Sequence, residues 1–96
     1  MPERVEPWMM DEVKTYLERI FLESRVEYFP RGGGAAVMYR IEIRAHTGGQ
    51  HILHQLWLDK SFFLRNADRS ALRSALEGAD LRQTMRKARD KIVELR

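Results

Sequence analysis

The chain of 96 residues contains no cysteine. Its absence excludes disulfide bonds, cysteine-ligated zinc sites and catalysis by a thiol. A chain without cysteine is typical of proteins in the reducing cytoplasm, which do not use disulfides to hold their fold. We therefore expect a cytoplasmic protein whose stability depends on its hydrophobic core.

Long apolar runs are also missing from the sequence. No stretch comes close to the roughly 20 apolar residues that a membrane-spanning helix needs. The N-terminal segment Met-Pro-Glu-Arg-Val-Glu-Pro lacks the apolar part of a secretory signal peptide. We therefore expect no membrane among the partners of this protein.

The residue patterns of catalytic, cofactor and metal sites are scarce as well. Gly32-Gly33-Gly34 leads into a strand-like segment and not into the Gly-Lys-Ser/Thr and helix of a nucleotide-binding loop. Glu42 and Asp59 are too far apart along a strand pair to hold one metal ion for catalysis. His46 and His51 flank a turn, but a zinc site requires at least a third protein ligand. We expect no enzyme, no cofactor and no metal site.

Charge is plentiful but unevenly distributed along the chain. The 17 Lys/Arg and 14 Asp/Glu residues give a net charge of +3. Residues 1–59 contain 7 basic and 9 acidic residues, a net charge of −2, whereas residues 60–96 contain 10 basic and 5 acidic residues, a net charge of +5. A basic half suggests a polyanionic or acidic partner. Alternatively, the two halves attract each other within the fold or within a dimer.

The segment from Val37 to Leu58 is the most informative part of the chain. Apolar and polar residues alternate, Gly48-Gly49 interrupts the pattern, and the alternation then resumes. This pattern predicts a β-hairpin over 37–58 that is closed by a tight turn. Pairing across the two glycines places Ile41 opposite Leu56.

The alternation also predicts which hairpin side chains share a face. The face expected to join the core consists of Val37, Tyr39, Ile41, Ile43, Ala45, Ile52, His54, Leu56 and Leu58. The opposite face combines apolar with charged and polar side chains: Met38, Arg40, Glu42, Arg44, His46, His51, Leu53, Gln55, Trp57 and Asp59. An apolar group on a bare sheet face is unusual, so we expect a partner subunit, a ligand or the segment around Phe63 to cover it.

The N-terminal part begins with a predicted helix over about 7–24. Pro7 suits the first turn, and apolar residues follow at helical spacing. A short strand over 26–29 and a glycine-rich connection over 30–34 come next.

The C-terminal third is predicted to be helical. Asn66 is a candidate N-cap and Gly78 a candidate C-cap, which gives a helix near 67–77. Asp80 opens a second helix near 80–95, and a single kinked helix is the alternative. The apolar stripe of the second helix is formed by Leu81, Met85, Ala88, Ile92 and Leu95.

These elements predict a single α+β domain over residues 1–96. It has an N-terminal helix, a three-stranded antiparallel meander with the main hairpin 37–58, and one or two C-terminal helices packed on one sheet face. The order of elements resembles that of double-stranded RNA-binding domains. The chain lacks the Gly-Pro-x-His loop of that family, and Asp68, Ser70 and Ala71 stand where its lysine cluster opens the last helix. The resemblance therefore extends to element order alone, which does not carry function.

A line of arginines on the last predicted helix is the first candidate site. Arg82, Arg86 and Arg89 are spaced i, i+4 and i+7, and Arg69 and Arg73 form a smaller pair on the preceding helix. Such a ridge is suited to following a nucleic-acid backbone, because each phosphate that it neutralises adds salt-dependent affinity. The alternative is a solvated helix face whose arginine stems cover apolar surface.

The open sheet face is the second candidate site. It would use Trp57 and Leu53 as anchors, with Arg40, Arg44 and Met38 around them. An aromatic ring among cations can stack unpaired bases, but Trp57 and Leu53 suit a homodimer or a protein partner equally well. The sequence thus leads to two hypotheses: a non-catalytic nucleic-acid-binding domain, and a dimeric interaction or regulatory module.

Overall fold

The computed structural model describes residues 4–44, 51–88 and 91–96, and within them the side chains of all residues except Arg44 and His51. The elements, in chain order, are α1 (Pro7–Ile20), β1 (Ser24–Arg31), the short 3-10 helix η1 (Gly32–Gly34), β2 (Ala36–Arg44), β3 (His51–Asp59), α2 (Lys60–Arg65), α3 (Arg69–Gly78), α4 (Leu81–Lys87) and β4 (Val93–Leu95).

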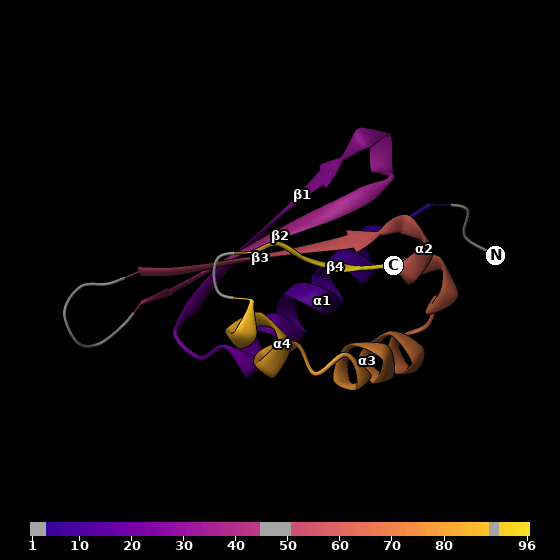
Figure 1. Ribbon diagram of the computed structural model, residues 1–96. Coiled ribbons are helices and arrows are strands. Elements are labelled where there is room, and N and C mark those ends of the chain that lie inside the picture. Colours follow the sequence, from indigo (N-terminus) through magenta and orange to yellow (C-terminus); the bar gives the residue numbers. More distant parts are fainter. Residues whose placement is uncertain (1–3, 45–50, 89–90) are drawn as a thin grey trace.

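The four strands form one sheet in the order β1-β2-β3-β4. The first three strands are antiparallel, as the meander predicts, and β4 adds to β3 in parallel. The helices lie together on one side of the sheet, while the end of the β1–β2 hairpin that carries η1 extends beyond them (Figure 1). The predicted α+β class is therefore confirmed, with a fourth strand added.

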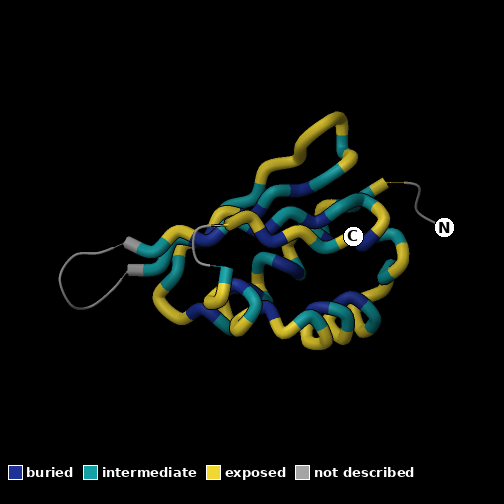
Figure 2. The backbone as a smooth tube through the Cα atoms, in the orientation of Figure 1, coloured by how far each residue is buried: buried dark blue, intermediate teal, exposed yellow. Residues whose placement is uncertain are grey.

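The core lies between the sheet and the helices. Buried residues concentrate where the helices meet the strands, and the η1 end of the hairpin is exposed (Figure 2). Helical spacing explains the buried positions of α1, because Met9, Val13 and Leu17 recur at intervals of four on one face. Residues of α3, α4 and the sheet complete the core: Leu72, Leu76, Leu81, Met85, Val26, Val37, Tyr39, Ile41, Leu56, Leu58 and Val93, with Phe62 and Phe63 from α2.

The predicted register of the main hairpin is wrong by two residues. The structure pairs Ile41 with His54, whereas the predicted register pairs Ile41 with Leu56. The predicted turn at Gly48-Gly49 lies outside the described residues. Because the side-chain period of a strand is two, a shift of two residues leaves every described side chain on its predicted face.

The predicted helix over 80–95 is also wrong in its second half. α4 ends at Lys87, and the chain forms β4 where the helix would have continued. A continued helix would bury Ile92, whereas the structure leaves Ile92 50% exposed and buries Val93 opposite Leu56 of β3. A β-branched residue fits this sheet edge better than a helix interior. Tertiary pairing therefore overrides the helical period.

The start of α3 differs from the predicted one, whereas α4 begins after Asp80 as predicted but without a capping hydrogen bond to its side chain. The N-cap of α3 is Asp68, whose carboxylate accepts a hydrogen bond of 2.8 Å from the amide of Ala71, and not Asn66. Asp80 precedes α4 with φ of 47°, and its side chain forms no capping hydrogen bond. The left-handed conformation at Asp80 redirects the chain between α3 and α4, so these helices do not merge into one.

Candidate ligand-binding site

Two predicted site residues, Arg82 and Arg86, lie on α4 beside the open end of the core. The buried side chains Leu81 and Met85 hold α4 against the protein, and each arginine directly follows one of them. The two arginines are therefore one helical turn apart on the same side of α4, and both are exposed.

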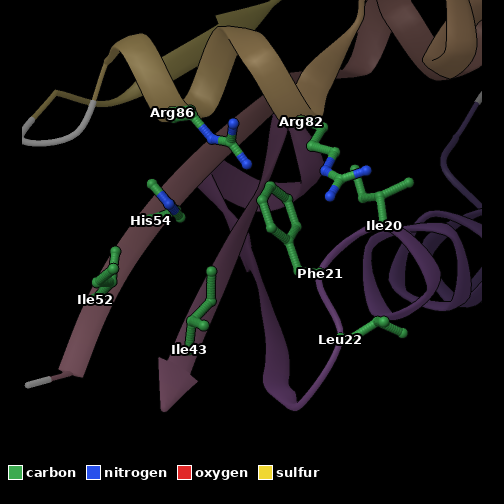
Figure 3. Close-up of a pocket in the computed structure, with 8 residues that line it drawn as sticks. All are labelled: Ile20, Phe21, Leu22, Ile43, Ile52, His54, Arg82 and Arg86. Carbon is green, nitrogen blue, oxygen red and sulfur yellow. The ribbon is translucent and has the colours of Figure 1, made fainter. Parts of the chain in front are cut away.

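A pocket of about 390 Å³ lies below these arginines. The C-terminal end of α1 and the residues after it form one wall, β2 and β3 form the floor, and α4 forms the other wall. Figure 3 shows the two guanidinium groups between α4 and the ring of Phe21, that of Arg86 on the His54 side of the ring and that of Arg82 on the Ile20 side. The lining residues are Ile20, Phe21, Leu22, Ile43, Ile52, His54, Arg82 and Arg86.

An aromatic pair forms the bottom of the pocket. Phe21 and His54 are both buried, and their ring centroids are 5.6 Å apart with an interplanar angle of 32°. His54 is the one buried polar residue among those that the structure describes. The sequence predicts His54 at the edge of the core, and the structure places it there with one side facing the pocket. Phe21 reaches the same place because α1 ends at Ile20.

The charge of the pocket is positive. Among the described residues, its lining includes two arginines and no carboxylate. Within the described ranges 4–44, 51–88 and 91–96, neither Arg82 nor Arg86 forms an ion pair. An unpaired guanidinium presents several N–H donors in a planar fork, which suits phosphate or carboxylate oxygens. The pocket thus combines an anion-binding wall with an apolar interior.

The other arginines of the predicted ridge are not part of this site. Arg73 on α3 forms an ion pair of 3.0 Å with Glu12 on α1, so it holds two helices together. Arg69 is the first residue of α3 and is exposed. Arg89 lies outside the described residues. The structure therefore places Arg82 and Arg86 together, and it separates them from the α3 pair by the break at Asp80.

The open sheet face contains a row of apolar side chains that the sequence predicts only in part. Phe29 of β1 lies directly opposite Met38 of β2, and Met38 lies directly opposite Trp57 of β3. Phe29 is 38% exposed, whereas Met38 and Trp57 are half-buried. The alternation along β1 already places Arg25, Glu27 and Phe29 on one face of their strand. Only the pairing of β1 with β2 shows that Phe29 belongs to this apolar row.

The remaining residues predicted for this face lie away from that row. Arg40 forms an ion pair of 3.3 Å with Glu42 on its own strand. Leu53 lies opposite Glu42 and is 38% exposed. The side chain of Arg44 is outside the described part of the structure. Ion-paired residues therefore separate Leu53 from the apolar row.

Trp57 borders a second, smaller pocket. It has a volume of about 240 Å³ and is lined by Ala36, Trp57, Asp59, Glu94, Leu95 and Arg96. Within the described residues, the buried indole Nε1 of Trp57 has no hydrogen-bond partner. A buried N–H without a partner is uncommon, so this ring is suited to a contact that supplies an acceptor.

Other site types find no support in the described part of the chain. No group of three or more His, Asp or Glu residues there is arranged to hold a metal ion. His46 lies outside that part, and so does the side chain of His51. None of the helices described is both long enough and apolar enough to cross a membrane.

Comparison with protein-family models, with curated proteins and with solved structures found no match. The function must therefore be inferred from the geometry of the site.

Proposed function

We propose that this protein is a non-catalytic, cytoplasmic nucleic-acid-binding domain that holds phosphate groups on Arg82 and Arg86. The observation that carries the proposal is the presence of two exposed guanidinium groups, unpaired among the described residues, at one pocket whose described lining includes no acidic side chain. Arginine binds phosphate oxygens through two parallel N–H donors, so a pair of arginines one turn apart suits a phosphate-bearing chain.

The surrounding charge supports the same proposal. Lys87 follows Arg86 in the last turn of α4, and residues 60–96 have a net charge of +5. A positive field around a phosphate site accelerates association and adds affinity that falls with salt, because bound phosphates release their counterions.

The test is fluorescence anisotropy with labelled DNA and RNA oligonucleotides, both single-stranded and duplex, over a range of salt concentrations. We expect binding that weakens steeply with salt, and we expect Arg86→Glu to weaken it about tenfold or more. Loss of one phosphate contact should also reduce the slope of log affinity against log salt by about 0.7 to 0.9.

Arg69→Glu is the matched control, because it makes the same charge change at an exposed position outside the pocket. We expect it to weaken binding much less than Arg86→Glu does. Equal losses in the two variants would show that binding follows net charge and would contradict a site on α4. Binding that ignores both salt and Arg86→Glu would contradict the proposal as a whole.

A second candidate function rests on the row Phe29, Met38 and Trp57. In this alternative the protein is an interaction or regulatory module, and the open sheet faces of two copies pack together as a homodimer. Aromatic and methionine side chains are enriched at protein interfaces. Trp57→Glu should then convert a dimer into a monomer in sedimentation velocity, whereas Gln55→Glu, on the same face, should not. A wild-type protein that stays monomeric at high concentration would contradict this alternative.

A further inference from the structure

The pocket on α4 is larger than a phosphate group requires. A duplex backbone lying across Arg82 and Arg86 would contact the two guanidinium groups and leave the interior empty. That interior measures about 390 Å³, within the range of small-molecule sites, and is lined mainly by aliphatic and aromatic carbon. A ligand that fits the whole pocket therefore has an anionic group and a flat or apolar body attached to it.

We infer that the pocket between α4 and the sheet accepts one unstacked base of a single-stranded nucleic acid, whose neighbouring phosphate lies on Arg82 and Arg86. This inference rests on the proposed nucleic-acid binding and specifies the form of nucleic acid. Proteins that select single strands combine cationic side chains for the backbone with aromatic rings on which bases stack.

The chemistry of each wall agrees with a base as the occupant. Phe21 supplies an aromatic ring, and the flat ring of His54 lies beside it at the floor of the pocket. The planar guanidinium groups above can both stack on a base and donate to its edge. A simple aliphatic chain would use none of these planar and polar groups.

The rim of the pocket is apolar and accessible. Leu22 is 76% exposed beside the opening, and Ile43 and Ile52 are half-buried on the sheet side. Exposed apolar side chains next to two arginines provide a surface for the sugar and for the edge of a base. They also provide positions that can be changed with little effect on the core.

The test compares two single strands of equal charge by fluorescence anisotropy at low salt. One is a 15-mer of deoxythymidine, and the other is a 15-mer of abasic sites with the same number of phosphates. We expect the strand with bases to bind about five-fold more tightly or better, because stacking on an aromatic ring contributes at least that factor. A 15-base-pair duplex carries about twice as many phosphates, so it is compared at equal phosphate concentration, where it should bind less tightly than the strand with bases.

Substitutions of residues that line the pocket test whether the preference for the strand with bases arises there. Phe21→Leu should remove most of the preference for bases and leave the affinity for the abasic strand unchanged, whereas Arg86→Glu should weaken the binding of both strands. Leu22→Ser should reduce the preference as well, and it keeps the test decisive if Phe21→Leu fails to fold. The matched control is Leu53→Ser, the same change on the opposite sheet face, which should have no effect.

The outcomes separate this inference from the proposed function. If the two strands bind with equal affinity and Arg86→Glu weakens the binding of both, the pocket does not accept a base, and phosphate binding on the arginines remains. A preference that survives both Phe21→Leu and Leu22→Ser would also overturn the pocket. Binding of neither strand would overturn the proposed function itself, and a small carboxylate with an apolar body would then be the occupant to examine.

Discussion

The hydroxyl of Tyr39 on β2 donates a hydrogen bond of 2.8 Å to the backbone carbonyl oxygen of Met10 on α1. Tyr39 is fully buried, and its ring lies 5.7 Å from that of Tyr28, whose hydroxyl donates to the carboxylate of Asp11. Burial, above all, raises the pKa of Tyr39, and the negative charges nearby act in the same direction. The hydroxyl therefore stays protonated and remains a donor. These two tyrosines attach the first helix to the edge strand β1 and to its neighbour β2.

Tyr39→Phe should lower the free energy of unfolding by about 1 kcal/mol, because it removes a buried hydrogen bond without changing the shape of the ring. Urea denaturation followed by circular dichroism measures this loss. Tyr28→Phe is the matched control, since its bond to Asp11 is exposed and should contribute less. A larger loss in Tyr28→Phe than in Tyr39→Phe would contradict this account.

Asp68→Ala should destabilise the protein by about 1 kcal/mol, because the carboxylate of Asp68 caps α3 through the amide of Ala71. Asparagine caps a helix almost as well as aspartate does, so Asp68→Asn should retain nearly all of the stability. Thermal unfolding of the two variants checks the difference. Equal melting temperatures for Asp68→Ala and the wild type would show that the cap contributes nothing.

Asp59 should make stability depend on pH in the acid range. Hydrogen bonds from the hydroxyl and the amide of Ser61 lower the pKa of Asp59 below its ordinary value of 3.8. A group with a lowered folded pKa stabilises the fold above its unfolded pKa, and this contribution is lost as the pH falls through the folded pKa. The wild type should therefore lose stability below about pH 4 relative to Asp59→Asn.

The urea midpoints of unfolding are measured for the wild type and for Asp59→Asn, at pH 6 and at pH 3. The change with pH in the difference between the two midpoints gives the contribution of Asp59 to stability. Other carboxylates titrate in both proteins, so their effects cancel in this comparison. We expect the advantage of the wild type to be present at pH 6 and to shrink at pH 3. An advantage that grows on acidification would reverse the sign and contradict the lowered pKa.

Val93→Asp should destabilise the protein strongly, because Val93 is buried opposite Leu56 and the new carboxylate would lose its hydration there. Ile92→Asp is the matched control at the neighbouring position, which is 50% exposed. If residues 80–95 formed a helix, Ile92→Asp would destabilise the protein more than Val93→Asp, since Ile92 belongs to the apolar stripe of that helix. Thermal melting of the two variants therefore tests whether the C-terminal segment forms β4.

Local patterns predict much of this fold. Alternation in the sequence places Tyr39, Leu56 and Trp57 on their observed faces, because the period of a strand does not depend on the register. The register itself depends on how the whole strands pair, and the position of Gly48-Gly49 alone does not determine it.

The C-terminal strand and the pocket could not be predicted in the same way. Ile92 and Val93 are adjacent, so a helix and a strand place different members of the pair inside, and only the pairing with Leu56 decides between them. The sequence predicts Arg82 and Arg86 as members of one ridge with Arg89, but the approach of Phe21 and His54 depends on how α1, α4 and the sheet pack. Contacts between distant segments have no local signature in the sequence.

The parallel strand β4 also shields the backbone of β3. It pairs with Leu56, Trp57 and Leu58, residues whose amide and carbonyl groups would otherwise form an open edge of the sheet. Chain synthesis reaches β4 only after α2, α3 and α4, so the edge of β3 stays uncovered until the last segment docks. An open edge accepts strands from other molecules, which makes the order of assembly a source of aggregation or strand exchange. The short C-terminal strand therefore removes this part of β3 from contact with other copies once it docks.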